Sequence, residues 1–247
     1  MQAPAADTLE RLVPAELAPE DLTGRATLAL HEERYRFARS HLRPGRTLDL
    51  ACGVGYGCEI LAERTDVRVV GVDVSEHAIA YARRHHPGSR IEYRTSDAFS
   101  FTDPEGFDTI VSLETLEHVA DPGGLVSRFA AMLRPGGRLV ASVPTTPSVD
   151  LNPHHRHDFD ERSFRRLLNA CAPSLREIAL LQQTQDVSIG RVLARRERRM
   201  RDLRPALARY YLRHPGAFAR RVHATLRYGF CNRYSTLVLE KPEGCPP

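Results

Sequence analysis

The sequence has no long hydrophobic run. None of its apolar stretches reaches the roughly 18 consecutive residues that a membrane-spanning helix needs. The first residues, MQAPAADTLERLVP, lack the basic-then-apolar order of a secretory signal. We therefore expect a protein of the cytoplasm without a membrane span.

Cysteine and lysine are scarce as well. The five cysteines form no C-x-x-C pair and are odd in number, which favours reduced thiols over a disulfide framework. Lys241 is the only lysine, so almost every positive charge is an arginine. What remains, 42% hydrophobic and 27% charged residues in a chain of 247, is typical of one large globular domain.

The positive charge gathers in one segment. Residues 190–228 carry 12 arginines against two acidic residues, a net charge of +10, whereas the whole chain carries only +4. Phe218, Val222 and Leu226 recur every four residues there, which predicts an amphipathic helix. Three uses stay open: a lid over the active site, a contact in a homo-oligomer, or a basic face for an anionic or carrier-linked acceptor. No RNA-binding signature accompanies the arginines, so nucleic acid is the least favoured partner.

Helix and strand patterns alternate along the chain. Four short apolar runs predict buried strands, at residues 46–52, 67–73, 107–113 and 137–144. An antiparallel hairpin of residues 175–184 and 233–242 is expected to complete the sheet. Strands joined by helical crossovers form a mostly parallel sheet with helices on both faces. Such sheets bind ligands beyond the carboxyl ends of their strands, where we therefore seek the site.

A glycine-rich turn follows the first predicted strand, in LDLACGVGYG (residues 48–57). Its glycines let the backbone pass close to a ligand. Asp73, twenty residues after Gly53, ends the second strand and can accept hydrogen bonds from both hydroxyls of a ribose. A dinucleotide fingerprint is excluded, because Cys58 stands where its third glycine would be. Asp49, before the turn, suits a cationic or amino-bearing ligand.

These motifs resemble those of the class I S-adenosylmethionine-dependent methyltransferases. DLACGVGYG is similar to the first motif of that family, GVDVS to its ribose-binding motif, SDAF to its adenine-contacting turn and LRPGGRLV to the turn before its fifth strand. The resemblance covers about residues 45–182 and 233–241. It implies an α/β, Rossmann-like, seven-stranded and mostly parallel sheet in a methyltransferase domain of residues 45–247. A helical cap (1–44) would precede this domain, and a basic helical insertion (185–230) would precede its last strand.

The resemblance also implies S-adenosylmethionine as the cofactor. The contacts that it implies are Tyr35, Asp49, Ala51, Gly53, Gly55, Asp73, Val74, Asp97, Ala98 and Leu113. Asp73 would hold the ribose, and Asp97 with Ala98 would meet the adenine. Tyr35, in HEERYRFA, lies on a segment similar to the helix that covers the cofactor in many members, so it would face the methionine part.

A second polar group follows the fourth predicted strand, in SLETLEHVADP. Glu114, Glu117 and His118 form E-x-x-E-H, and on a helical turn they would share one face. Two carboxylates crowded with an imidazole favour a proton or a cation among them. A further ligand would come from the loop after the fifth strand, where NPHHRHDFD (residues 152–160) supplies three histidines.

This arrangement is similar to that of the metal-dependent 2′-O-methyltransferases of plant small RNAs, which pair E-x-x-E-H with a downstream histidine. The metal ligands that this resemblance implies, for Mg²⁺ or Mn²⁺, are Glu114, Glu117, His118 and His157. The loops after the fourth and fifth strands would carry proton removal, with Glu114 and His118 closest to the acceptor and with His154 as a contact of the substrate or a base. His155 would be solvated.

The function expected from these features is O-methylation of a small hydroxylated acceptor, a sugar or a secondary-metabolite intermediate with adjacent oxygens. An alcohol needs help losing its proton, which the acids and imidazoles could give. The first alternative is metal-independent N-methylation of an amino sugar or amine, and the second is RNA 2′-O-methylation. A cofactor-binding scaffold without catalysis is disfavoured, because acidic and imidazole groups crowd the acceptor position.

Overall fold

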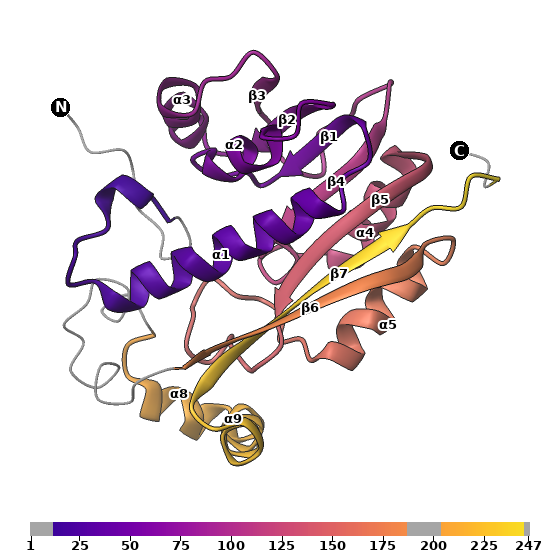
Figure 1. The fold of residues 1–247 in the computed structure, drawn as a ribbon. Helices are drawn as coiled ribbons and strands as arrows, with labels where there is room; N and C mark the ends of the chain where they lie inside the picture. Colours follow the sequence, from indigo (N-terminus) through magenta and orange to yellow (C-terminus); the bar gives the residue numbers. More distant parts are fainter. Residues whose placement is uncertain (1–11, 187–203, 245–247) are drawn as a thin grey trace.

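The computed structural model describes residues 12–186 and 204–244. Within these residues seven strands form one mixed sheet in the order β3-β2-β1-β4-β5-β7-β6 (Figure 1). The strands are β1 (Gly45–Leu50), β2 (Val67–Asp73), β3 (Ile91–Thr95), β4 (Phe107–Leu113), β5 (Leu133–Pro144), β6 (Arg176–Asp186) and β7 (Cys231–Glu240). β7 is antiparallel to both β5 and β6, and the other pairs are parallel. The order confirms the predicted Rossmann-like fold.

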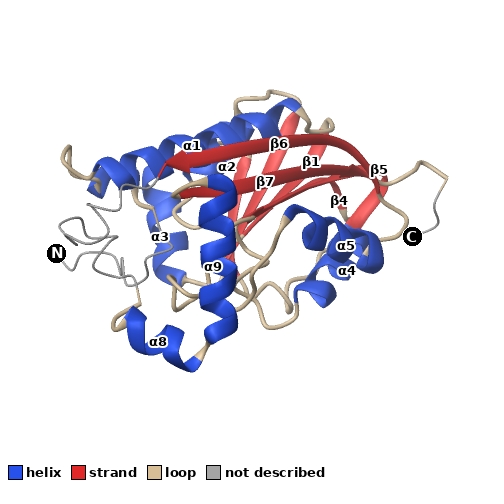
Figure 2. Cartoon of the chain, turned by 90° about the horizontal axis from the view of Figure 1, so that it is seen from below, coloured by secondary structure: helices blue, strands red, loops and turns tan. Residues whose placement is uncertain are grey.

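Helices cover both faces of the sheet. They are η1 (Pro14–Glu16, a 3-10 helix), α1 (Leu22–Ser40), α2 (Tyr56–Ala62), α3 (Glu76–His85), α4 (Pro122–Met132), α5 (Glu161–Cys171), α8 (Leu207–Arg213) and α9 (Pro215–Tyr228). Helices α4 and α5 lie on one face, and α1, α2 and α3 on the other (Figure 2). None of the described helices is long and apolar enough to cross a membrane.

The central strands are buried on both faces, which is why they appear in the sequence as short apolar runs. Side chains of a strand alternate between the two layers. In β1, Leu48 and Leu50 pack in the core with Phe129 of α4. Asp49, between them, faces the opposite layer and accepts a hydrogen bond from Tyr35 of α1. The alternation therefore places one carboxyl group between the sheet and α1.

Helix α4 has a capped start, and β5 follows its last residue directly. The Asp121 side chain accepts a hydrogen bond from the Gly124 N–H, and Pro122 is the first residue of the helix. The RPGG turn lies inside β5, which begins at Leu133, and the pairing of β5 with β4 shifts register there. Gly136 adopts φ 74° in this turn, a conformation that glycine tolerates.

The basic segment is only partly described. Residues 187–203 lie outside the described residues, and α8 and α9 follow them, below the ends of β6 and β7 (Figure 1). These two helices are tied to the loop after β5 through Asp150, which accepts hydrogen bonds from Tyr211 Oη at 2.6 Å and Arg221 Nε at 2.9 Å. The domain boundaries drawn from the sequence stay a prediction.

Candidate functional site

A cavity of about 210 Å³ opens at the carboxyl ends of β1, β2 and β4, where the fold predicts a ligand site. It is lined by Leu12, His31, Tyr35, Ala51, Cys52, Gly53, Val54, Tyr56, Asp73, Leu113, Glu114, Thr115 and His118. The structure therefore brings five predicted cofactor residues and two predicted catalytic residues to one cavity. We call it the central cavity.

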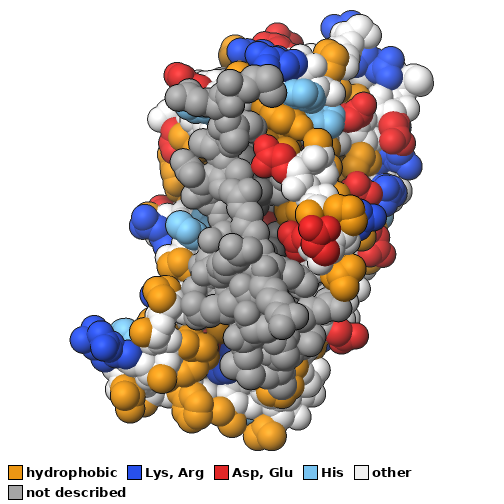
Figure 3. Space-filling model, turned by 90° about the vertical axis from the view of Figure 1, so that its left-hand side faces the viewer, with side chains coloured by type: hydrophobic (Ala, Val, Ile, Leu, Met, Phe, Trp, Pro, Cys, Tyr) orange, Lys and Arg blue, Asp and Glu red, His pale blue; other side chains and the backbone are white. Residues whose placement is uncertain are grey.

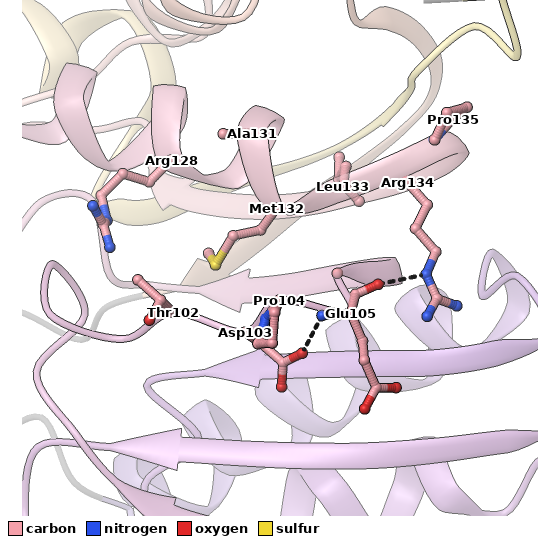
Figure 4. Close-up of a pocket in the computed structure, with 11 residues that line it drawn as sticks. Thr102, Asp103, Pro104, Glu105, Arg128, Ala131, Met132, Leu133, Arg134 and Pro135 are labelled. Carbon is pink, nitrogen blue, oxygen red and sulfur yellow. Dashed lines mark hydrogen bonds between the residues drawn. The ribbon is translucent and has the colours of Figure 1, made fainter. Parts of the chain in front are cut away.

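A second, larger cavity of about 420 Å³ lies at the opposite end of the sheet, where β4 and β5 begin. Figure 4 shows the residues that line it. Its walls are the segment before β4 and the junction of α4 with β5. The polar groups there bind one another: Asp103 accepts from the Glu105 N–H, and Arg134 donates to the Glu105 carbonyl. Asp103 also pairs with Arg46, which lowers the pKa of its carboxyl to about 2. We therefore place the candidate active site in the central cavity.

The glycine turn is shaped around Asp73. Ala51, Gly53 and Gly55 have φ of 66°, 57° and 91°, so the chain turns back on itself between β1 and α2. The Gly53 N–H donates to Asp73 at 2.9 Å, and the Ser75 N–H donates to the other carboxylate oxygen at 2.9 Å. These bonds fix the buried carboxylate at the end of β2, in the cavity wall.

Helix α1 reaches the cavity because α2 contains a glycine. A Cβ on Gly57 would lie 2.0 Å from the Tyr35 ring, so only glycine allows this approach. The Tyr35 hydroxyl then donates to Asp49 at 3.2 Å, and the Cys58 thiol donates to the same carboxyl at 3.1 Å. Burial raises the pKa of Asp49 to about 7, although these two hydrogen bonds act in the opposite direction. Asp49 lies directly behind the cavity wall that Tyr35 forms.

Besides Asp49, four predicted cofactor residues are not among those that line the central cavity. Gly55 lies within the turn, and Asp97 and Ala98 follow β3. The Asp97 carboxylate accepts from the Phe99 N–H at 2.8 Å, which holds the turn. Val74, next to Asp73, is 67% exposed.

Glu114 directly follows β4 and is held in the wall of the central cavity by its neighbours. Its φ of 51° is unusual for a residue with a side chain. Its N–H donates to Ser142 Oγ at 3.1 Å, and Ser142 Oγ donates to the Glu114 carboxylate at 2.8 Å. Arg34 of α1, 1% exposed, lies 3.8 Å from the same carboxylate and stacks over the Tyr234 ring. Neither Arg34 nor Ser142 was predicted from the sequence, although Arg34 directly precedes Tyr35.

The E-x-x-E-H segment is a turn, and this differs from the prediction. Because Glu114 takes a positive φ, the residues after it do not continue as a helix, and the His118 N–H donates to the Thr115 carbonyl. Glu114 and His118 line the central cavity. Glu117 is fully buried behind them. The three side chains therefore do not share one face.

Glu117 and His118 lie close to a histidine of the loop after β5. Ligand atoms of Glu117, His118 and His155 all lie within 4.8 Å of one another. The rings of His118 and His155 are 4.6 Å apart, and His155 Nδ1 lies 2.7 Å from Ser148 Oγ. The main chain sets this contact, because the Glu117 carbonyl accepts from the N–H groups of residues 156 and 157.

The set of potential ligands therefore differs from the predicted one in two positions. The Nε2 atom of His157 lies 3.0 Å from the Val119 carbonyl, so this ring is turned away from the group. Glu114 binds Ser142 instead. His155, predicted to be solvated, is half-buried in the group, whereas His154, predicted to contact the substrate, is exposed. The pattern of the loop did not reveal which of its histidines faces β4.

Comparisons with known proteins agree with this geometry. Residues 48–141 match the family model of a methyltransferase domain. A phosphoethanolamine N-methyltransferase of Arabidopsis thaliana is 38% identical over 117 residues, 44% of this chain and 24% of that protein. A ubiquinone biosynthesis O-methyltransferase of Bradyrhizobium diazoefficiens is 41% identical over 100 residues, 40% of this chain and 39% of that protein. The matched part of the chain thus spans much less than two thirds of the length of these two relatives.

Solved structures are similar over more of the chain. The N-methyltransferase NodS of Bradyrhizobium japonicum WM9, in complex with S-adenosyl-L-homocysteine, has a TM-score of 0.60 at 20% identity, over 98% of this chain and 100% of that one. At this identity the likeness concerns the fold alone. The motifs at the strand ends, the order of the sheet and the matched family model lead to one assignment. The chain contains a methyltransferase domain, matched at residues 48–141, and has the fold of the class I S-adenosylmethionine-dependent methyltransferases.

Proposed function

We propose that the chain transfers the methyl group of S-adenosylmethionine to a hydroxyl oxygen of a small acceptor, a sugar or a secondary-metabolite intermediate with adjacent oxygens. The observation that carries this proposal is the position of Glu114. Its carboxylate lies in the same cavity as Asp73 and the glycine turn, and Ser142 holds it at 2.8 Å. A fixed carboxylate beside the cofactor suits an acceptor that must lose a proton.

The methionine part of the cofactor would lie against α1. His31, Tyr35 and Tyr56 line the cavity with their rings 5.3 to 5.9 Å apart, and aromatic faces attract a cation such as a sulfonium. A Cβ on Gly53 would meet nothing within 4 Å, so the backbone there is open to a ligand. These groups fit the cofactor.

The nucleoside part would extend beyond the central cavity. A volume of about 210 Å³ is less than the roughly 300 Å³ at which ligand pockets usually begin. Asp73 would bind the ribose hydroxyls at the cavity edge. The adenine would then cover Val74, an apolar side chain that is exposed in the described residues, and would reach Asp97.

The acceptor would bind beside Glu114, at what we call the acceptor end of the cavity. The residues there would act mainly by positioning the acceptor and by removing its proton. When bound, S-adenosylmethionine supplies an electrophilic methyl group on sulfur. Glu114 would accept the proton of the acceptor hydroxyl, while Ser142 fixes its direction and Arg34 balances its charge. His118, in the same cavity, would contact the acceptor beside it.

We further propose that a divalent cation binds beside this end, at Glu117, His118 and His155. One carboxylate and two imidazoles suit Mn²⁺, Co²⁺ or Zn²⁺ better than Mg²⁺, which prefers oxygen ligands. The cation would supply a contact for two adjacent oxygens of the acceptor.

Calorimetric titration of Mn²⁺ into the protein loaded with S-adenosylhomocysteine tests the cation site. We expect binding at one site, about tenfold or more weaker in a His155→Ala protein and unchanged in the matched His157→Ala protein. Loss of binding in His157→Ala alone would restore the ligand set predicted from the sequence. Absence of binding in the unmodified protein would refute the cation proposal and leave proton removal to Glu114.

Two matched sugars, one with a hydroxyl group and one with an amino group at the same position, test the O-methylation proposal. The protein is incubated with methyl-labelled S-adenosylmethionine and either a sugar with a vicinal diol or its 2-amino-2-deoxy counterpart. We expect label on oxygen for both sugars, identified by the carbon chemical shift of the new methyl group, and a faster reaction at higher pH. Label on nitrogen alone would contradict the proposal.

N-methylation of an amine is the second candidate. It is favoured by the comparisons, which include a phosphoethanolamine N-methyltransferase and the N-methyltransferase NodS. A neutral amine needs no base, so an N-methyltransferase would keep its rate without Glu114. RNA 2′-O-methylation stays third.

A further inference from the structure

Helices α8 and α9 dock on the core through a narrow polar and small-residue contact. Ala217 and Ala224 are buried, and Arg221 between them donates to Asp150 at 2.6 Å. Tyr211 of α8 donates to the same carboxylate. The Asp150 charge therefore neutralises Arg221, and this face of α9 is turned toward the core.

The remaining face of these helices is apolar and exposed. Six of the ten large hydrophobic side chains that are exposed among the described residues lie between residues 212 and 230. They are Leu212, Phe218, Val222, Leu226, Tyr228 and Phe230, with Leu212 and Leu226 at 85% and 83% exposure. Figure 3 shows hydrophobic side chains gathered at this end of the molecule. Such a concentration differs from the scattered apolar residues of an ordinary surface.

The same helices carry charge of one sign. Residues 204–230 contain six arginines and no acidic residue. Arg204 and Arg221 donate to the loop after β5, which leaves the exposed arginines Arg209, Arg213, Arg220 and Arg227. Arg220 approaches Asp158 only at 3.6 Å. We call these four arginines and the six exposed apolar side chains the α8–α9 surface.

We infer that the α8–α9 surface binds the protein to an anionic lipid bilayer. Arginines beside exposed Phe and Leu side chains are the pattern of a helix that lies in a bilayer interface, where the apolar groups enter the acyl boundary and the cations meet anionic headgroups. A second copy of this chain is a poorer partner, because a symmetric contact would bring four exposed arginines of each copy together. The inference does not depend on the acceptor.

Vesicle co-sedimentation tests the inference with the full chain. Vesicles of phosphatidylcholine alone are compared with vesicles of equal parts phosphatidylcholine and phosphatidylglycerol. We expect sedimentation with the anionic vesicles that falls as salt is raised. A Phe218→Ser, Leu226→Ser protein should bind about tenfold more weakly, because both side chains are exposed and would be the ones buried in lipid. An Arg213→Glu, Arg227→Glu protein should lose the preference for the anionic vesicles.

Matched control variants distinguish binding through the α8–α9 surface from nonspecific binding of the protein to vesicles. Ile178→Ser removes an apolar side chain of β6 that is 45% exposed, close to the 51% of Phe218. Arg84→Glu reverses an exposed charge on α3, at the opposite end of the molecule from α8 and α9 (Figure 1). Both should bind like the unmodified protein, and circular dichroism confirms that every variant is folded. No sedimentation, or equal loss in variants and controls, would overturn the inference. So would a dimer in light scattering that the Phe218→Ser, Leu226→Ser protein dissociates, because the surface would then join two copies.

Discussion

Replacing Glu114 by glutamine is expected to lower kcat/KM by about 10³-fold, within the usual range for loss of a general base. Glutamine has the same shape and can still accept the hydrogen bond from Ser142, but it cannot take the proton of an alcohol. The affinity for S-adenosylhomocysteine should stay the same, because Glu114 lies at the acceptor end of the cavity. Initial rates with an identified hydroxyl acceptor and a cofactor titration measure the two effects.

The control for this experiment is Glu63→Gln. Glu63 is exposed and pairs with Arg39 on the surface, so its replacement should leave the rate unchanged. If Glu114→Gln keeps the full rate on a hydroxyl acceptor, Glu114 serves only as the counter-ion of the buried Arg34. If it keeps the rate only on amines, N-methylation becomes the first candidate.

Cofactor affinity is expected to depend on pH through Asp49. The pKa of this carboxyl is raised to about 7 by burial. Since the cationic amino group of the cofactor would favour the ionised form, binding below that pKa should release a proton. The affinity for S-adenosylhomocysteine should therefore fall by up to about tenfold per pH unit below the pKa and level off above it. Calorimetry in buffers of different ionisation enthalpy measures both the affinity and the released proton.

The ligand-free protein should respond to pH in the opposite sense. A carboxyl whose pKa is raised in the folded state stabilises the fold below its ordinary value of 3.8, and this contribution is lost as the pH rises through about 7. An Asp49→Asn protein should show neither dependence, whereas Asp66→Asn, at an exposed turn, should keep the pH profile of binding. A pH-independent affinity in the unmodified protein would separate Asp49 from the cofactor.

Strands could be predicted where both of their faces are buried, because such strands appear in the sequence as continuous apolar runs. The runs at 67–73 and 107–113 coincide with β2 and β4, because nearly all their side chains are buried. Strand β3 was not located in the sequence. It lies at the sheet edge with only Tyr93 buried, so IEYRT carries no comparable apolar signal.

The closeness of Gly53 and Asp73 was predictable from the same regularity. Gly53 and Asp73 stand at the ends of β1 and β2, and the sheet brings these ends together. The positions of Glu114, Glu117 and the histidines could not be predicted in this way, because main-chain turns place these side chains. The positive φ of Glu114 and the hydrogen bonds to the Glu117 carbonyl decide which histidine lies near the turn after β4. Neither feature can be predicted from the pattern of residue types.

Two consecutive residues of α1 serve different halves of the central cavity. Tyr35 donates to Asp49, on the side proposed for the cofactor, and Arg34 faces Glu114, on the side proposed for the acceptor. Because both side chains are fixed to one rigid helix, α1 cannot shift away from one ligand without disturbing the other. If the cofactor and the acceptor bind where we propose, their binding should be linked through α1, and each ligand should tighten the binding of the other.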